Sequence, residues 1–244
     1  MTKTAAGLAA ACAVTAVSVA LADGEIKIKN TLAIGATLTR GNSESVQGNL
    51  SLLTEGEDEG IGSVRLGAEA NYGETTIENK NNTTLDNSKL FGNVRKTLSP
   101  HWFVYVDTSA MRDSTAGVKY RILAGPGLGC YLVKATNTTL SLEAGASHEW
   151  ERLEDTSSRF VVVRVAERLT YQISATARLW QSAEFLPEAK DFGNYTMTAE
   201  IGVEAALSSR MNLRLVLQDK FSSEPADSLK QNDLSLISGF STKF

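Results

Sequence analysis

The segment Met211-Asn-Leu-Arg-Leu-Val-Leu-Gln218 decides the fold class, because its hydrophobicity alternates along the chain. The odd positions carry the apolar side chains Met211, Leu213, Leu215 and Leu217, and the even positions carry Asn212, Arg214, Val216 and Gln218. Successive side chains of a β-strand point to opposite faces of the sheet, so this pattern predicts a strand with one apolar and one mainly polar face.

The same alternation recurs along the chain, and we interpret it as about twelve strands. The expected strands are residues 26–40, 44–54, 61–73, 85–97, 101–112, 117–133, 138–152, 158–171, 174–187, 193–207, 210–222 and 231–244. Crossing a bilayer at a tilt takes about 9–11 strand residues, and an even strand count is typical of single-chain bacterial barrels. The sequence therefore predicts an all-β protein, a single antiparallel up-and-down transmembrane β-barrel.

The connections between these segments support the same topology. Those after even-numbered segments are mostly short, as in Gln172-Ile173 and Ser208-Ser209, whereas those after odd-numbered segments tend to be longer and more polar, as in residues 74–84. Outer-membrane barrels have short periplasmic turns and longer extracellular loops. We therefore expect both termini at the periplasmic end of the barrel.

The N-terminal residues predict export. Lys3 supplies a positive charge, residues 5–21 are mainly apolar and small, and Ala20-Leu21-Ala22 forms a small-x-small cleavage pattern. Residues 1–22 are thus expected to be a cleaved signal peptide, which leaves residues 23–244 as the barrel domain. A lipoprotein modified at Cys12 is the alternative, but too little apolar sequence precedes that cysteine.

Composition excludes several other classes of protein. The formal net charge is −4 with no basic block, which argues against binding of nucleic acid. After residue 22 no apolar run approaches the roughly 18 residues of a membrane-spanning helix. Cys130 is the single cysteine after that point, so neither an intramolecular disulfide nor a cysteine-based metal site is expected. We predict no metal and no cofactor.

The C-terminal segment predicts how the chain reaches its membrane. One parity of the last expected strand carries Leu234, Leu236, Phe240, Thr242 and the terminal Phe244. A terminal aromatic residue on an alternating strand resembles the signal read by the barrel-insertion machinery of the outer membrane. Phe244 is therefore the predicted insertion signal, with that machinery and outer-membrane lipid as partners; the oligomeric state stays open. The alternative is a soluble periplasmic ligand-binding β-sandwich that happens to end in phenylalanine.

Charged residues of both signs occupy the parity opposite to the apolar one, and we predict that they face the lumen. They are Arg65, Glu69, Arg121, Glu143, Arg178, Glu184, Glu200, Glu204, Arg214 and Lys220. An unpaired charge in a confined space is costly. These residues therefore either form a salt-bridged plug or line a wet, charge-selective path. A barrel of twelve strands lies between filled eight-stranded and open sixteen-stranded barrels, so size does not decide between the two.

Some outer-membrane barrels hydrolyse lipids, so a catalytic set of residues is a possibility that the sequence can test. His148 lies between Ser147 and Glu149, but neighbours in a strand point to opposite faces, so Ser147 and His148 should diverge. Gly125-Pro-Gly-Leu-Gly129 lacks the Lys-Ser/Thr ending and following helix of a phosphate loop. We interpret these glycines as a kink, a bulge or a close approach to a neighbouring strand. We predict no catalytic residue, and a lipid-modifying hydrolase remains the alternative.

Several short motifs follow one another along the chain, namely Arg40-Gly-Asn42, Met111-Arg-Asp113, Tyr120-Arg121, Gly125-Pro-Gly-Leu-Gly129 with Tyr131, Leu142-Glu-Ala-Gly145, Gln181-Ser-Ala-Glu-Phe-Leu-Pro187, Ser222-Ser-Glu-Pro225 and Lys230-Gln-Asn-Asp233. In this order they resemble an uncharacterised bacterial family of salt-induced outer-membrane proteins. The resemblance covers about residues 30–244. It implies an outer-membrane barrel with a link to salt response, and it implies no known substrate. The leading hypothesis is a non-enzymatic barrel, either a structural envelope protein or a narrow passive pore for ions and small solutes.

Overall fold

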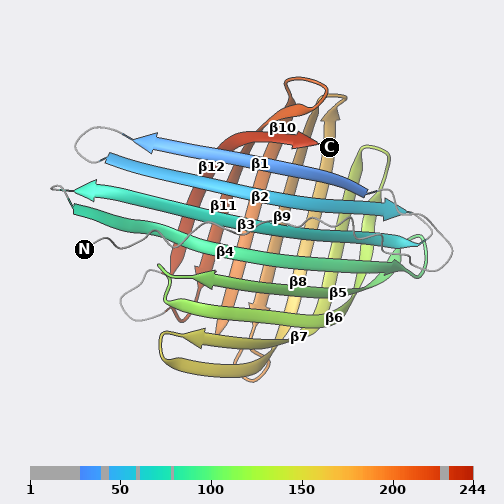
Figure 1. Ribbon diagram of the computed structural model, residues 1–244. Coiled ribbons are helices and arrows are strands. Elements are labelled where there is room, and N and C mark those ends of the chain that lie inside the picture. Colours follow the sequence, from blue (N-terminus) through green and yellow to red (C-terminus); the bar gives the residue numbers. More distant parts are fainter. Residues whose placement is uncertain (1–27, 40–43, 59–60, 78–79, 226–230, 244) are drawn as a thin grey trace.

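The described residues of the computed structural model, 28–39, 44–58, 61–77, 80–225 and 231–243, form twelve β-strands (Figure 1). The strands are β1 (Ile28–Thr39), β2 (Glu44–Asp58), β3 (Gly62–Ile77), β4 (Lys80–Thr97), β5 (Trp102–Asp113), β6 (Val118–Lys134), β7 (Thr138–Leu153), β8 (Thr156–Ser174), β9 (Ala177–Pro187), β10 (Tyr195–Ala206), β11 (Met211–Ser222) and β12 (Asn232–Lys243). No helix in this described part of the chain is long and apolar enough to cross a membrane. The expected signal peptide and Phe244 lie outside the described residues.

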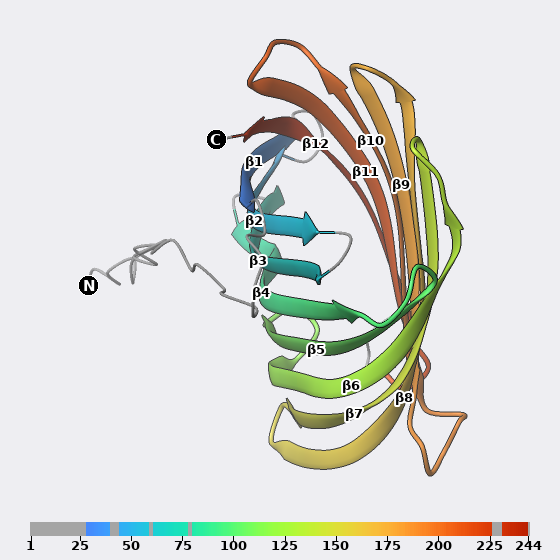
Figure 2. The ribbon, with the colours of Figure 1, turned by 90° about the vertical axis from the view of Figure 1, so that its right-hand side faces the viewer.

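Each strand pairs antiparallel with the next, and β1 pairs with β12, so the sheet closes into a barrel. This confirms the predicted fold class and shows that the β-sandwich alternative is wrong. The wall formed by β1–β5 lies opposite the wall of β8–β11, and their strands cross at a steep angle (Figures 1 and 2). Closing a sheet requires the strands to tilt relative to the barrel axis, and opposite walls therefore cross.

The predicted strand positions agree with the observed ones apart from a few hairpins. Residues 74–84, predicted as a loop, belong mostly to β3 and β4, and their connection is residues 78–79. This stretch is polar and therefore looks like a loop, but its threonines are β-branched and favour a strand that extends beyond the membrane. Gln172-Ile173, predicted as a turn, lies inside β8.

The two ends of the barrel differ less than the sequence suggested. Both ends of the described chain lie at one end, which we call the terminal end, and we call the opposite end the loop end. At the loop end only the connections 188–194 and 223–231 are long, while β7 and β8 are joined by residues 154–155. The expectation that the terminal end faces the periplasm rests on the usual architecture of outer-membrane barrels and stays a prediction.

Side-chain burial is reversed relative to a water-soluble protein. On β5, Phe103 and Tyr105 are buried in the lumen while Val104 and Val106 are exposed on the outside. On β12, Leu234 and Leu236 are 68% and 65% exposed. Soluble domains expose few such large apolar side chains in a continuous belt, whereas a lipid bilayer is their natural surrounding.

Candidate functional site in the barrel lumen

Four aromatic side chains in the lumen each pack against a glycine on the adjacent strand. The pairs are Phe91 with Gly67, Phe103 with Gly129, Tyr105 with Gly127, and Trp180 with Gly202. A Cβ at any of these glycines would overlap the ring, so only glycine allows such a close approach. This confirms the interpretation of the Gly125–Gly129 segment as a site of close strand contact.

An arginine guanidinium also lies over each of these four rings, which places positive charge in the lumen. Arg65 lies 5.7 Å from the centre of the Phe91 ring, Arg95 4.7 Å from Phe103, Arg164 5.2 Å from Tyr105, and Arg214 4.6 Å from Trp180. A cation over an aromatic face is attracted by the ring quadrupole. The glycine–aromatic–arginine stacks therefore fix several of the lumen cations in place.

The lumen side of β4–β9 is filled by ion pairs, which we call the packed network. Glu143 on β7 binds both Arg95 and Arg164, with 2.7 Å between Arg164 Nη1 and Glu143 Oε2. Arg164 Nε also donates to Glu184 at 2.6 Å and lies 4.0 Å from Asp107. The side chains of Glu143 and Arg164 are only 1% and 3% exposed. Buried charges persist only where they are paired, and this cluster meets that condition.

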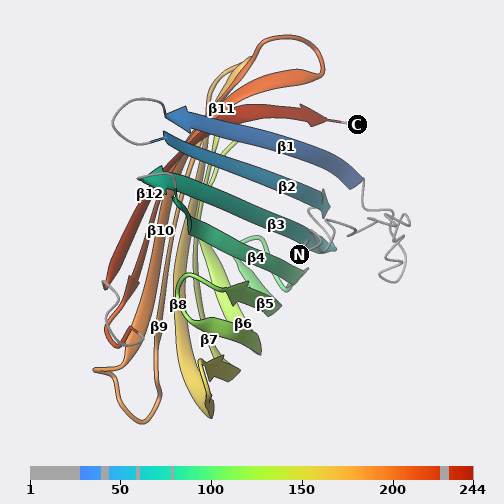
Figure 3. The ribbon, with the colours of Figure 1, turned by 60° about the vertical axis from the view of Figure 1, so that its left-hand side comes forward.

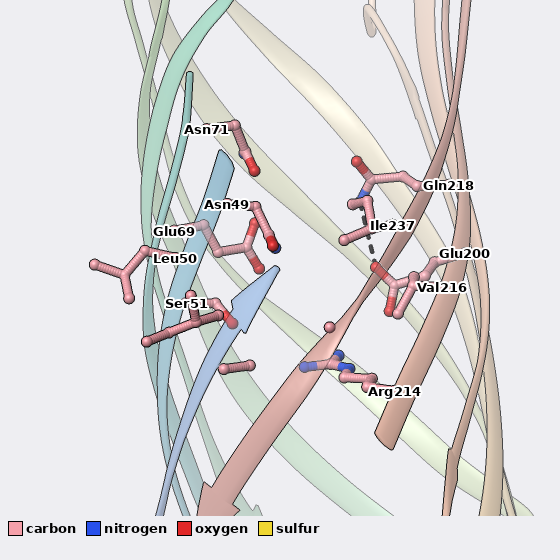
Figure 4. Close-up of a pocket in the computed structure, with 13 residues that line it drawn as sticks. Asn49, Leu50, Ser51, Glu69, Asn71, Glu200, Arg214, Val216, Gln218 and Ile237 are labelled. Atoms are coloured by element: carbon pink, nitrogen blue, oxygen red, sulfur yellow. Dashed lines mark hydrogen bonds between the residues drawn. The ribbon is translucent and has the colours of Figure 1, made fainter. Parts of the chain in front are cut away.

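Opposite the packed network lies a polar cavity, which we call the central cavity (Figure 4). Asn49, Ser51, Glu69 and Asn71 from β2 and β3 line one side, and Glu200, Arg214 and Gln218 from β10 and β11 line the other. Its volume is about 60 Å³. A buried water needs roughly 10–15 Å³ by this measure, so the cavity has room for a few waters.

Hydrogen bonds in the central cavity are incomplete. Glu200 accepts from Trp180 Nε1 at 2.6 Å and from Gln218 Nε2 at 3.2 Å. Arg214 stacks on Trp180, but its Nε is buried without a hydrogen-bond partner among the described residues. Glu69 makes no hydrogen bond or ion pair within the same part of the chain. A buried donor without an acceptor is costly, so a water or a solute is needed there.

At the loop end a second cavity opens, which we call the mouth cavity. Its volume is about 500 Å³. Its charged lining consists of Arg121, Glu149, Glu151, Arg159, Glu188 and Glu224. Arg121 pairs with Glu149 at 3.0 Å and with Glu151. Carboxylates outnumber guanidiniums, so the mouth cavity is negative. No cluster of His, Cys, Asp or Glu able to hold a metal ion occurs in the described residues.

Comparison with known proteins identifies the family. The model of the family described as "Protein of unknown function, DUF481" matches residues 32–244. The chain belongs to the DUF481 family. This confirms the family resemblance found in the sequence, although the link to salt response stays a prediction. No curated protein of known function matches the sequence of this DUF481 member.

Solved structures similar to this DUF481 chain are outer-membrane barrels. The COG4313 outer membrane channel from Pseudomonas putida F1 is 10% identical, with a TM-score of 0.52 over 94% of this chain and 99% of that one. The translocator domain of the autotransporter NalP from Neisseria meningitidis is 14% identical, with a TM-score of 0.50 over 89% and 87%. The NanC porin is 10% identical, with a TM-score of 0.50 over 89% and 98%. These likenesses establish the fold, that of an outer-membrane barrel.

The ten charged residues predicted for the lumen lie on the inward parity of their strands, in different surroundings. Glu143 and Glu184 belong to the packed network, Arg121 to the mouth cavity, and Glu69, Glu200 and Arg214 to the central cavity. Arg65 pairs with Glu55 at 3.3 Å, and Arg178 lies 3.9 Å from Glu204, which accepts from Ser241 Oγ at 3.2 Å. Lys220 shares the inward parity of Gln218 on β11.

Sequence reasoning missed central members of the packed network, namely Arg95, Asp107 and Arg164. The Arg164 signal is weak because both parities of residues 161–166 are largely apolar, so the inward face is not obvious from alternation. On the candidate hydrolase residues, the His148 ring lies 4.3 Å from the ring of Trp150, while Ser147 is buried on the other face. Ser147 and His148 diverge, as the strand geometry predicted.

Proposed function

We propose that this DUF481 chain is a non-enzymatic, narrow passive channel for ions and small solutes in the bacterial outer membrane. The observation that supports this is the central cavity, where polar side chains of β2 and β3 face those of β10 and β11 across a space large enough for water. In a barrel whose lumen is only a plug, the charges of the central cavity would be paired with each other, as the charges of the packed network are.

The lining of the two cavities favours cations. Glu69 and Glu200 outnumber Arg214 in the central cavity, and carboxylates outnumber arginines in the mouth cavity. A narrow path with low-dielectric walls focuses the field of its lining charges and concentrates ions of the opposite sign. The channel should therefore conduct cations in preference to anions.

The test is single-channel conductance of residues 23–244 refolded into a planar bilayer, with potassium chloride at different concentrations on the two sides. Folding is verified first by heat-modifiable migration on a gel. We expect a steady conductance and a reversal potential that indicates cation preference. Glu69→Gln should reduce that preference, because it removes a central-cavity carboxylate that holds no partner in place.

A matched control removes one carboxylate charge outside the lumen. Asp155 lies in the connection between β7 and β8 and its side chain is 92% exposed. Asp155→Asn should leave the reversal potential unchanged. Equal shifts in the two variants would show that general surface charge, rather than the central cavity, sets the preference.

A plugged structural barrel is the second candidate, and the packed network favours it. Folded protein without conductance would support this candidate and refute the channel. The lipid-hydrolase alternative predicts activity on phospholipid that His148→Ala abolishes. We expect neither the parent chain nor this variant to release fatty acid, and we expect the same conductance from both.

A further inference from the structure

The barrel is closed along only part of the β1–β12 seam. Five residues of β1, Thr31–Gly35, pair with Gly239–Lys243 of β12. On its other side β1 pairs with β2 over its full length, and β12 pairs with β11 from Asn232 to Thr242. Figures 1 and 3 show the result: β12 runs beside β1 near its C-terminal end and turns away from it in its first half.

The two strands part at a pair of glycines. Gly35 and Gly239 are the last paired residues toward the loop end. A Cβ on Gly239 would overlap the Ile34 backbone, and a Cβ on Gly35 would overlap Asn49 and the Ser238 carbonyl. Glycine within a strand often marks a bend or a close backbone approach, so the seam diverges at a defined position.

The open part of the seam lies at the level of the apolar exterior. Leu234 and Leu236, on the half of β12 that does not pair with β1, are among the most exposed apolar side chains. On the β1 side, Val46 of β2, which pairs with Leu38, is 58% exposed. Within the described strands these two edges have no backbone partner beyond Gly35 and Gly239. Backbone groups without partners are costly in hydrocarbon, so the edges require a polar partner at membrane depth.

The central cavity reaches this opening. Its lining includes Gly239, the last residue of β12 that pairs with β1, and Ile237 just beyond it, together with Arg214 in the lumen. The cavity therefore lies directly inside the point where the seam opens, between polar groups of the lumen and the apolar exterior. An occupant that fits both environments has a polar headgroup and an apolar tail.

We propose that the open β1–β12 seam is a lateral portal for a single-chain zwitterionic amphiphile, whose headgroup enters the seam so that its phosphate reaches the central cavity while its tail stays in the membrane. The unpartnered Arg214 Nε requires a hydrogen-bond acceptor, which a phosphate ester oxygen provides. Glu69 and Glu200 repel a net negative headgroup and attract the cationic part of a zwitterion. The portal is independent of axial ion conduction.

The test uses Trp180 as the reporter, because its indole donates to Glu200 in the central cavity. Trp102→Phe and Trp150→Phe leave it as the only tryptophan, and Cys130→Ser removes the free thiol. Residues 23–244 carrying these changes are refolded into phosphatidylglycerol vesicles. Lysophosphatidylcholine brominated near its headgroup should quench Trp180 saturably, and brominated lysophosphatidylglycerol should bind at least tenfold more weakly.

Closing the seam should block entry. Ala36 and Ser238 would be the next pair after Gly35 and Gly239, so Ala36→Cys with Ser238→Cys can be joined by oxidation. The disulfide should weaken quenching at least tenfold, and a reductant should restore it. The control pair, Leu32→Cys with Thr242→Cys, joins residues that are already paired and should change nothing.

The outcomes separate the portal from the channel. Undiminished quenching with the Ala36–Ser238 disulfide formed, or equal binding of both brominated amphiphiles, would overturn the proposal. If that disulfide fails to form while the control disulfide forms, the strands stay apart and the opening is supported. Ion conductance is measured on the same variants, and its loss or absence bears only on the channel.

Discussion

Inward-facing glutamates have different surroundings on the two sides of the lumen. Glu143 in the packed network is held by Arg95 and Arg164 and is almost fully buried. Glu69 in the central cavity also points inward but forms no ion pair among the described residues, and the space beside it is open. Inward parity therefore places a charge in the lumen, but the neighbouring side chains decide whether it becomes structural or stays free to meet a solute.

Side-chain volume explains the difference. Phe91, Phe103 and Tyr105 fill the space along β4 and β5, and each holds an arginine against its ring. Along β1 and β2 the inward positions carry small residues, including Ala33, Gly35, Asn49 and Ser51. Charges opposite small residues do not reach a partner across the barrel, and the space between them stays open as the central cavity.

The largest expected effect comes from breaking the packed network. Glu143→Ala leaves Arg95 and Arg164 buried without their shared counter-charge, which should destabilise the barrel by about 3–5 kcal/mol. The free energy of unfolding is measured in urea from lipid vesicles, and heat-modifiable migration reports the folded fraction.

Glu69→Ala is the matched control on the other side of the lumen. It removes a carboxylate that holds no ion pair in the described structure, so the loss should stay below about 1 kcal/mol. Similar losses in the two variants would remove the distinction between a structural and an open side. In that case Arg164→Met, which replaces the buried guanidinium by an apolar side chain, would show whether side-chain volume or charge causes the loss of stability.

The second effect concerns the stacks that fill the lumen. Gly127→Val would force the Tyr105 ring toward Arg164, and overpacking of this kind costs about 1–3 kcal/mol. Gly48→Val is the control, because a Cβ at Gly48 meets no atom within 4 Å. Valine favours strands, so this change should be neutral or slightly stabilising. Equal stability of the two variants, by the same unfolding measurement, would show that the ring moves without cost.

Strand number, barrel closure and the inward placement of most charges could be predicted from the sequence because each is encoded locally. The alternation around Arg214 has clear apolar and polar parities, whereas that around Arg164 does not. The packed network could not be predicted in full because two of its pairs, Arg95–Glu143 and Asp107–Arg164, join strands that are not neighbours in the barrel. Arg95 and Glu143 meet only through the stagger and tilt of the closed barrel.

The incomplete seam was also beyond local patterns. Both β1 and β12 alternate over their whole lengths, and nothing in either segment shows that only Thr31–Gly35 pair across it. Gly35 and Gly239 are visible in the sequence, but their contact depends on joining the two ends of the chain. The central cavity that reaches this seam depends in turn on which residues face each other across the lumen.

The smallest expected effect on stability concerns an ion pair outside the lumen, which serves as the reference for the buried pairs. Lys119 Nζ donates to Asp155 at 2.8 Å on the exposed loop end, and this hydrogen bond and charge hold the pKa of Asp155 below its ordinary value. A lowered pKa adds stability above the unfolded value and loses it as the pH falls through the folded value. Because both side chains are exposed and screened, Lys119→Ala should lower the unfolding free energy only slightly, the least of all these variants.

The same variant should still move the titration of Asp155. Without Lys119 the pKa of its carboxyl rises toward the ordinary range, and Arg152→Ala should raise it less, because Arg152 lies 4.0 Å away and contributes only through its charge. NMR of labelled aspartate carboxyls measures both shifts. A stability loss in Lys119→Ala close to that of Glu143→Ala would mean that exposed pairs at the loop end support the barrel as much as the packed network does. If only the pKa moves, burial is what separates the structural charges of this barrel from the rest.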